Sequence, residues 1–288
     1  MGDLMPARPG ERLRHRQTDG SDVEQEFGDA LTVEHGCSIG ASFRFRLGIF
    51  SAPRYTVRMQ DDSLLPPDVR ERLRTLLHVF LAENEKLNLT ALRAEEACWI
   101  GNILDSLAFL SVPDSSLTAD RSLLLDLGTG GGFPLLPLAI ALPEIQCTGL
   151  DSVRKKIDAV GRIVQTMELR NVTLIAERSE ILGKVLLHRE HYDIVLSRAV
   201  APLSILLEYA SPFVKPGGSI VLWKSLHIDE ELEKSGTAQR EFRCPLSATH
   251  RYALPGDFGE RQLLIFRKEG PLSKRYPRAI GDAKREPV

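Results

Sequence analysis

The sequence has few cysteines, and they do not lie in a pattern that would bind a metal or build a disulfide framework. Four are scattered over the 288 residues, with no Cys-x-x-Cys pair: Cys37, Cys98, Cys147 and Cys244. We therefore expect no metal site and no disulfides. This sparing use of cysteine favours a reducing, cytoplasmic location.

Long apolar runs and a strong excess of one charge are also absent. No apolar run approaches the roughly 18 residues of a membrane span, and the N-terminus lacks the continuous apolar core of a signal peptide. These absences argue against a membrane protein. The net charge of −2 means that any surface for nucleic acid must be local. With 43% apolar residues, the chain can form one substantial core with some residues left over.

The chain is expected to divide into four parts. Residues 1–58 show no sustained period of 2 or 3.6, so we interpret them as a disordered extension or as a start assigned too early, with Met59 as the alternative start. Residues 59–118 are predicted to form a helical cap, 119–270 an α/β core that binds the cofactor, and 271–288 a basic tail.

Two amphipathic helices are predicted in the cap. Pro66, Pro67 and Asp68 open the first, and its apolar residues recur at helical spacing: Val69, Leu73, Leu76, Leu77, Phe80 and Leu81. The second runs from about Glu95 to Leu110. Their apolar faces should pack on the core. Four polar residues are candidates to face a substrate: Asn88, Thr90, Asp105 and Ser106.

A glycine-rich turn follows the first strand of the core. Leu123–Leu125 is predicted as a buried strand that ends at Asp126, and three alternate glycines then make a tight turn: Gly128, Gly130 and Gly132. Glycine permits positive φ and lets a ligand approach the backbone, and the helix that follows offers unpaired N–H groups. The sequence therefore predicts a nucleotide-binding corner of a doubly wound α/β domain, with Gly128 and Gly130 lining the site.

The ligand of this corner is predicted to carry a positive charge. A dinucleotide fingerprint has glycine at the sixth position of the turn, where this chain has Phe133. Asp126 lies two residues before the first glycine, a spacing that resembles the S-adenosylmethionine site of class I methyltransferases. Its carboxylate would stabilise an ammonium group but repel a phosphate. The alternative is a dinucleotide oxidoreductase, which tighter binding of NADH than of S-adenosylmethionine would indicate.

Strand and helix patterns alternate regularly after the turn. Five parallel strands are predicted at 123–126, 146–150, 172–176, 193–196 and 219–223, and a hairpin of strands at 248–254 and 261–267 closes the sheet. Between the strands we expect a helix capped by Ser152, a helix from Glu180 to about His188, and a turn at Lys215–Gly218. The expected fold is α/β. It is a class I methyltransferase (Rossmann-like) fold with a seven-stranded, mostly parallel sheet and an N-terminal helical cap.

Candidate cofactor contacts lie at the ends of the second and third strands, where ligands of open α/β sheets bind. Asp151 ends the second strand 23 residues after Gly128, the usual distance for a carboxylate that binds two ribose hydroxyls. A helix-capping acid is the alternative. Ser179 and Glu180 follow the third strand, where a backbone N–H and a side chain would hold adenine.

Two motifs that would indicate other methylation reactions are absent from the end of the fourth strand, which has the sequence Ser197-Arg-Ala-Val-Ala-Pro202. It has no Asn-Pro-Pro-Tyr motif for an exocyclic amine, and no cysteine lies at a strand end to attack pyrimidine C5. What remains is an acceptor such as guanine N7, which carries a lone pair and no proton and needs positioning rather than a base. Arg198 and Lys224, at the ends of the fourth and fifth strands, are candidates to orient the substrate, with an ion-paired role as the alternative.

Several segments together resemble the bacterial 16S ribosomal RNA methyltransferase G family, also called glucose-inhibited division protein B. They are Asn88-Leu-Thr90, Ile103-Leu-Asp-Ser-Leu107, Asp126–Pro134, Leu150–Lys156, Leu196–Ala199 and Lys274–Arg278. The resemblance implies N7 methylation of one guanine in 16S rRNA, with S-adenosylmethionine as donor. It also implies cofactor contacts at Gly128, Phe133, Ser179, Glu180 and Arg198. The chain departs from the family pattern at Asn102, usually His, and at Leu135, usually Gly.

The C-terminal tail carries the most pronounced local basic patch. Lys274, Arg275 and Arg278 surround Tyr276, which predicts phosphate contacts and base stacking with RNA; a frayed, solvated terminus is the alternative. We expect a monomeric, cytoplasmic enzyme that acts on 16S rRNA or the small ribosomal subunit. A non-catalytic ribosome-assembly or RNA-binding protein with a methyltransferase fold is the alternative. Cofactor binding without methyl transfer would indicate it.

Overall fold

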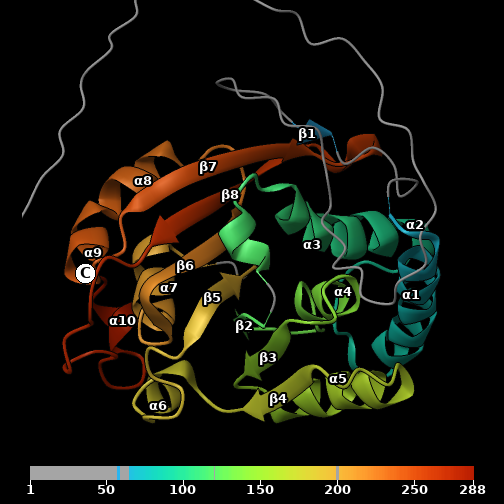
Figure 1. Ribbon diagram of the computed structural model, residues 1–288, viewed down its shortest axis with the longest axis horizontal. Coiled ribbons are helices and arrows are strands. Elements are labelled where there is room, and N and C mark those ends of the chain that lie inside the picture. Colours follow the sequence, from blue (N-terminus) through green and yellow to red (C-terminus); the bar gives the residue numbers. More distant parts are fainter. Residues whose placement is uncertain (1–56, 59–64, 120, 199–200) are drawn as a thin grey trace, which may run out of the picture. The chain divides into compact units, whose positions relative to one another are not determined.

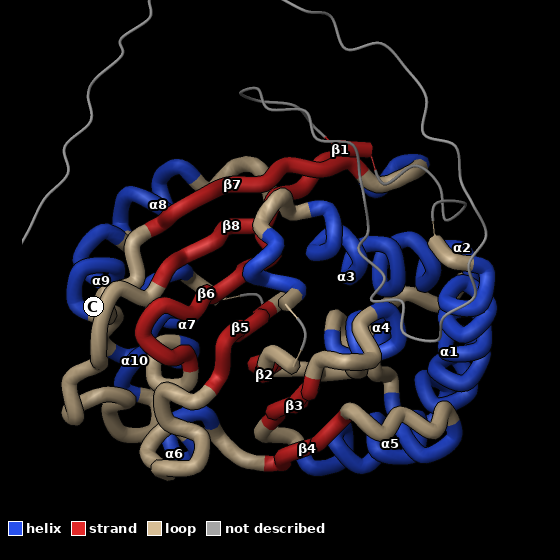
Figure 2. Tube along the Cα trace, in the orientation of Figure 1, coloured by secondary structure: helices blue, strands red, loops and turns tan. Residues whose placement is uncertain are grey.

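The computed structural model describes residues 57–58, 65–119, 121–198 and 201–288 (Figures 1 and 2). The expectation for residues 1–58 therefore lies outside the described residues, except at its last two positions. These form β1 (Val57–Arg58), which pairs in parallel with β7 (Leu246–Ala253) at one edge of the sheet.

One sheet runs through the protein in the order β1-β7-β8-β6-β5-β2-β3-β4. Its other strands are β2 (Leu123–Leu127), β3 (Gln146–Asp151), β4 (Val172–Ala176), β5 (Tyr192–Ser197), β6 (Val214–Lys224) and β8 (Glu260–Arg267). Only β8 runs antiparallel to its neighbours, β6 and β7. The predicted class I methyltransferase fold is confirmed, because β2–β8 give a doubly wound, seven-stranded sheet closed by an antiparallel hairpin. The two-residue β1 adds an eighth strand.

Helices cover both faces of the sheet (Figures 1 and 2). The cap and two core helices lie on one face: α1 (Pro67–Leu87), α2 (Glu95–Cys98), the π-helical turn η2 (Trp99–Leu104), α3 (Asp105–Leu107), η3 (Ala108–Ser111), α4 (Leu135–Ala141) and α5 (Arg154–Thr166). The other face carries α6 (Ser179–Leu182), α7 (Leu203–Ala210), α8 (Asp229–Lys234), α9 (Gly236–Glu241) and α10 (Asp282–Arg285). Single 3-10 turns occur at η4 (Ser115–Thr118) and η5 (Gly256–Phe258).

The alternation of side chains along the strands builds a separate apolar core on each face. In β2, Leu124 contributes to the core under the cap, whereas Leu125 contributes to the core under α7. The predicted apolar face of α1 is confirmed, since Leu73, Leu76 and Phe80 are fully buried against the first core. Asp126, one residue beyond Leu125, therefore lies on the face that the cap covers.

Two helix predictions were wrong at their ends. The helix from Glu180 stops at Leu182 instead of His188, because Gly183 follows: a Cβ there would lie 3.0 Å from Pro212, and glycine inside a helix costs about 1 kcal/mol. Ser152 does not cap α5. The N-cap residue is Val153, which has no side-chain capping bond, and its N–H donates to Asp151 Oδ1 at 2.8 Å.

The predicted turn at Lys215–Gly218 was also wrong, because these residues belong to β6. Gly218 allows the strand to continue close to β5, since a Cβ at this position would lie 2.6 Å from the carbonyl oxygen of Asp193. The predicted hairpin was right, and β7 and β8 pair antiparallel from Leu246 to Phe266.

Candidate active site at the carboxyl edge of the sheet

The glycine corner is fixed to the neighbouring strand by backbone hydrogen bonds. The N–H groups of Gly128 and Thr129 both donate to the carbonyl of Leu150, at 2.8 and 3.0 Å. Gly128, Gly130 and Gly132 all have positive φ, of 76°, 57° and 90°. The sharp turn therefore requires glycine at these positions, as predicted from the alternate spacing.

Asp126 is a fully buried acid beneath this corner. Neither of its carboxylate oxygens has a hydrogen-bond partner among the described residues. Burial raises the pKa of Asp126 to about 6, although the neighbouring Thr129 hydroxyl and the Arg198 guanidinium act in the opposite direction. An unpartnered buried carboxylate is costly, and a cationic ligand group at this position would satisfy it.

The cap packs directly on the glycine corner. Phe80 of α1 contacts Phe133 edge to face, with ring centroids 4.7 Å apart. A Cβ at Gly131 would lie 3.2 Å from the Phe80 ring and 3.3 Å from Leu89. The turn that carries Leu89 is held by Asn84, whose Oδ1 accepts from the Thr90 N–H at 2.9 Å. The predicted Asn88–Thr90 segment thus lies against the turn that was predicted to bind the cofactor.

Asp151 lies beside the glycine corner at the end of β3. Its Oδ2 accepts a hydrogen bond from the Gly130 N–H at 3.0 Å, and its Oδ1 accepts from Val153 at the start of α5. The carboxylate therefore connects the corner to the residue before the next helix, but it does not cap that helix. Each oxygen accepts one hydrogen bond and retains a second lone pair, so ribose binding stays a prediction.

Arg198 follows β5 and points to the face that the cap covers. Its Nη1 donates to the Gly101 carbonyl at 2.9 Å and to Asp105 Oδ2 at 3.0 Å, and its Nη2 donates to Asn102 Oδ1 at 3.0 Å. The guanidinium carbon lies 5.7 Å from the centre of the Phe133 ring. The structure thus brings together two residues that were predicted to contact the cofactor.

Asp105 joins four elements, and sequence reasoning missed this role. It is fully buried in α3 and also accepts hydrogen bonds from Tyr252 of β7, at 2.7 Å, and from Arg261 of β8, at 3.1 Å. Its backbone carbonyl accepts from Trp223 Nε1 of β6. The one signal in the sequence was an acid between apolar residues at helical spacing, which we had interpreted as a substrate-facing position.

The two departures from the family pattern have structural partners. Asn102 is buried in the π-helical turn and accepts a hydrogen bond from Arg198, as described above. Leu135 is fully buried at the start of α4 and fits because β3 has glycine opposite it: a Cβ at Gly149 would lie 2.6 Å from Leu135 Cδ2. The Nδ2 group of Asn102 is buried and has no hydrogen-bond partner among the described residues.

Lys224 lies at the end of β6 but on the other face of the sheet from Arg198. Trp223, the preceding residue, points to the cap, so Lys224 points to α8. There its Nζ donates to Glu231 Oε1 and to the carbonyl of Ala201, both at 2.7 Å. This is the ion-paired alternative, and a part in orienting the substrate stays a prediction.

The side chain of Glu180 faces the C-terminal tail. It is buried, and its Oε1 accepts hydrogen bonds from Arg178 at 3.3 Å and from the Gly281 N–H at 3.2 Å. The Ser179 hydroxyl donates to the other oxygen at 3.2 Å. Any contact of these two residues with adenine would therefore use their backbone rather than the Glu180 carboxylate.

The tail is folded against the protein, so the predicted stacking of a base on Tyr276 was wrong. Tyr276 is 4% exposed and packs edge to face on Phe242, with centroids 4.9 Å apart. The frayed-terminus alternative was wrong too, because Arg278 binds the buried Glu208 through Nε and Nη2, and Arg275 pairs with Glu241.

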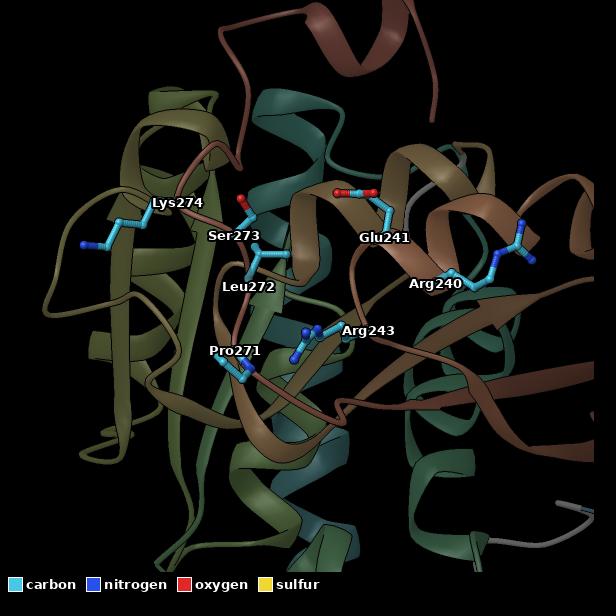
Figure 3. Close-up of a pocket in the computed structure, with 7 residues that line it drawn as sticks. All are labelled: Arg240, Glu241, Arg243, Pro271, Leu272, Ser273 and Lys274. Atoms are coloured by element: carbon cyan, nitrogen blue, oxygen red, sulfur yellow. The ribbon is translucent and has the colours of Figure 1, made fainter.

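The tail packs on the face of the sheet away from the cap, and its Leu272 and Tyr276 lie near the amino end of β5. Arg189, which precedes β5, donates to the carbonyls of Tyr276 and Leu272. Lys274 lines a shallow pocket of about 530 Å³ there, and Figure 3 shows it and Arg240 extending to opposite sides of this pocket, with Arg243 between them. The structure therefore does not bring Lys274 or Arg275 together with Arg198.

No group of three or more His, Cys, Asp and Glu side chains among the described residues could hold a metal ion. No helix within the described ranges is both long enough and apolar enough to cross a membrane.

Comparison with known proteins gives one family. The family model described as rRNA small subunit methyltransferase G matches residues 69–250. Proteins of that name from Carboxydothermus hydrogenoformans and Staphylococcus carnosus are 39% and 35% identical to this chain. The alignments cover 73% and 80% of this chain and 88% and 95% of the relatives.

Solved structures also resemble this chain. One is a SAM dependent methyltransferase from Aquifex aeolicus, with a TM-score of 0.46 and 16% identity over 65% of this chain and 97% of that one. Another is precorrin-6y C5,15-methyltransferase from Geobacter metallireducens, with a TM-score of 0.40 and 16% identity over 54% and 84%. By the family model and the curated relatives, the chain belongs to the rRNA small subunit methyltransferase G family.

Proposed function

We propose that this protein transfers a methyl group from S-adenosylmethionine to N7 of a guanine in 16S ribosomal RNA. The observation that carries the proposal is Asp126, a buried carboxylate without a partner, directly beneath a glycine corner in a member of a methyltransferase family. A buried acid suits a ligand with an ammonium group and opposes a pyrophosphate, which argues against the dinucleotide alternative.

S-adenosylmethionine, when bound, supplies a methyl group on a sulfonium. The residues of the corner fit this donor: Asp126 would accept hydrogen bonds from its ammonium group, and Asp151 would accept from its ribose hydroxyls with its remaining lone pairs. Gly128 and Gly130 leave the backbone open beside these acids, and Ser179 and Glu180 would contribute backbone groups.

The proposal of guanine N7 as the acceptor rests on the catalytic groups that this reaction does not require. Guanine N7 carries a lone pair and no proton, so the protein has only to position it and to stabilise charge. The described cysteines cannot act as nucleophiles, since Cys98, Cys147 and Cys244 are buried and burial raises the pKa of each, to about 12 for the last two.

Arg198 is the residue of this chain best placed to meet the base. Three of its N–H groups bind the cap, and the Nε–H and one Nη2–H have no partner among the described residues. These two donors would hold guanine O6 or a phosphate oxygen. Lys274, Arg275 and Arg278, in the tail, would contact RNA away from the modified base. We propose further that the enzyme is a monomer in the cytoplasm.

The test is methyl transfer from labelled S-adenosylmethionine to small-subunit RNA that lacks the modification, both as naked RNA and as assembled subunits. Label in the RNA with the wild type, and none with Arg198→Ala, supports the proposal. A control variant, Lys234→Ala, removes an exposed cation from α8 and should leave the rate unchanged. Tight binding of S-adenosylmethionine without transfer to either substrate would favour the non-catalytic alternative.

A further inference from the structure

Asp105 holds the guanidinium group of Arg198 from the cap side. We infer that Asp105 is a positioning residue, which aims Arg198 at the site of methyl transfer and keeps it away from Asp126. The inference rests on the proposed function of Arg198. It gives a role in the reaction to a fully buried residue whose described hydrogen-bond partners lie outside the glycine corner.

Asp105 is held in one place by hydrogen bonds from several elements of the fold. The side chain is fully buried, and three donors from three separate elements satisfy it: Arg198 after β5, Tyr252 in β7 and Arg261 in β8. Both arginines bind the same oxygen, Oδ2, whereas the tyrosine hydroxyl binds Oδ1. A buried carboxylate with charge-assisted hydrogen bonds of this kind has one orientation, so it can fix the orientation of its partners.

Arg198 is held by the cap at one end of its guanidinium only. Both hydrogens of Nη1 are used, by Gly101 and Asp105, and one hydrogen of Nη2 is used by Asn102. The side chain is 21% exposed, and its unused donors are the Nε–H and the second Nη2–H. The planar fork cannot rotate without breaking these bonds, so the two free donors are presented in a fixed direction.

A second acid competes for Arg198. The Asp126 carboxylate has no hydrogen-bond partner among the described residues, and burial raises its pKa, a rise that the charge of Arg198 partly offsets. Without the negative charge at Asp105, the Arg198 guanidinium would be drawn towards Asp126. It would then neutralise the acid that is proposed to bind the ammonium group of the donor. Loss of Asp105 should therefore weaken both substrate orientation and donor binding, and both effects should require Arg198.

The experiment is a double-mutant cycle of Asp105→Asn and Arg198→Ala, with Tyr252→Phe as the control. Asp105→Asn keeps the shape and an acceptor for Tyr252 but removes the charge. Tyr252→Phe removes a hydrogen bond from the same carboxylate and leaves the Arg198 contact in place. Each variant is measured for kcat/KM with small-subunit RNA, for the dissociation constant of S-adenosylmethionine by calorimetry, and for the temperature of thermal unfolding.

The expected result is a roughly 10- to 100-fold loss of kcat/KM in Asp105→Asn, mostly in kcat, with weaker donor binding. In the Arg198→Ala background the same substitution should have no further effect on either quantity. Tyr252→Phe should stay within about threefold of the wild type even if its unfolding temperature falls. Equal losses in both backgrounds, or an equal loss in Tyr252→Phe, would overturn the inference.

Two further measurements test the role of Asp105 if the wild type is inactive or if Asp105→Asn does not fold. If the wild type does not methylate RNA, the proposed function fails, and the dissociation constants alone still test whether Asp105 acts through Arg198. If Asp105→Asn does not fold, Asn102→Ala takes its place in the cycle, because Asn102 accepts only from Nη2. A roughly threefold to tenfold loss that depends on Arg198 would support positioning from the cap, and an effect independent of Arg198 would contradict it.

Discussion

Arg198 and Asp105 form a partly buried ion pair, with Nη1 3.0 Å from Oδ2, between residues 93 positions apart in the sequence. The pair connects the end of β5 to the cap and therefore couples the region where the base is expected to bind to helices outside the α/β core. Under the proposed function the cap forms part of the active site, because it supplies every described hydrogen-bond partner of the Arg198 guanidinium.

Asp126→Asn should stabilise the protein without cofactor while weakening donor binding. The pKa of this buried acid is raised to about 6, so the folded state binds a proton more tightly than the unfolded state. The stability of the wild type should therefore fall as the pH rises from about 4 to 6, and the variant should lack this slope. Above pH 6 we expect a gain on the order of 1–2 kcal/mol.

The measurement for Asp126 is denaturant unfolding between pH 4 and 8, together with calorimetry of S-adenosylmethionine. The wild type should bind the donor more tightly as the pH rises through 6, because the acid must be ionised to hold an ammonium group. An asparagine variant that binds as tightly as the wild type, with the same pH dependence, would rule out this role for Asp126.

Asp151→Ala should raise the dissociation constant of S-adenosylmethionine about 10- to 100-fold, equivalent to roughly 1.5–3 kcal/mol for lost hydrogen bonds to a charged group. Two effects contribute, because the carboxylate is predicted to bind ribose and also holds the Gly130 N–H at 3.0 Å. Asp151→Asn separates them, since its amide oxygen can still accept from one N–H group. Calorimetry with both variants is the test, and an unchanged constant in Asp151→Ala would exclude Asp151 from the site.

Gly131→Ala should destabilise the contact between the cap and the glycine corner. Its Cβ would lie 3.2 Å from the Phe80 ring and 3.3 Å from Leu89, so α1 must move. We expect a loss of about 1–3 kcal/mol in the free energy of unfolding. The control is Gly161→Ala in α5, where the nearest atom is 3.7 Å away and alanine should be neutral or stabilising. Equal unfolding temperatures for the two variants would argue against tight packing at Gly131.

Glu83→Gln should remove an acid-sensitive bond between α1 and α5. Hydrogen bonds from Arg162 and Lys86 lower the pKa of Glu83 from 4.5 to about 2. A lowered carboxyl pKa stabilises the folded state above pH 4.5, and this stabilisation is lost as the pH falls towards 2. The variant should be less stable than the wild type at neutral pH, and the difference should disappear near pH 2.

The control for Glu83 is Glu230→Gln. Glu230 pairs with Lys234 on the surface of α8, where both side chains are largely exposed, so this pair should contribute little. Unfolding midpoints from pH 2 to 7 would be compared among the three proteins. A Glu83→Gln variant that follows the wild type over the whole range would contradict the proposed link.

Much of the fold could be predicted because the local patterns and the global arrangement agree. The strands at Leu123, Gln146 and Val172 are short apolar runs separated by helical patterns, and only a parallel sheet satisfies both. The positive φ angles of Gly128, Gly130 and Gly132 could likewise be predicted from the alternate spacing of these glycines. The ends of elements were less predictable, as at Gly183 and Gly218, because close approach to a distant segment decided them.

Only part of the candidate site could be predicted from the sequence, for a different reason. The role of Asp105 depends on Arg198, Tyr252 and Arg261, which lie on three strands and have no common spacing in the sequence. The tail was predicted wrongly because nothing in the sequence pairs Arg278 with the buried Glu208, or Arg275 with Glu241. The direction of Lys224 could have been predicted from the alternation of side chains along its strand. The preceding Trp223 is apolar and points to the cap, so Lys224 points to the opposite face of the sheet.

The most direct test of the central claim is to map the methylated base after reaction of small-subunit RNA with labelled S-adenosylmethionine. The proposal predicts one labelled guanine, modified at N7, since this atom carries a lone pair and no proton and needs neither a general base nor a nucleophilic thiol. That label should be absent with Arg198→Ala. A label on an exocyclic amine or on a pyrimidine carbon, or an unchanged yield with Arg198→Ala, would contradict the assignment of this site.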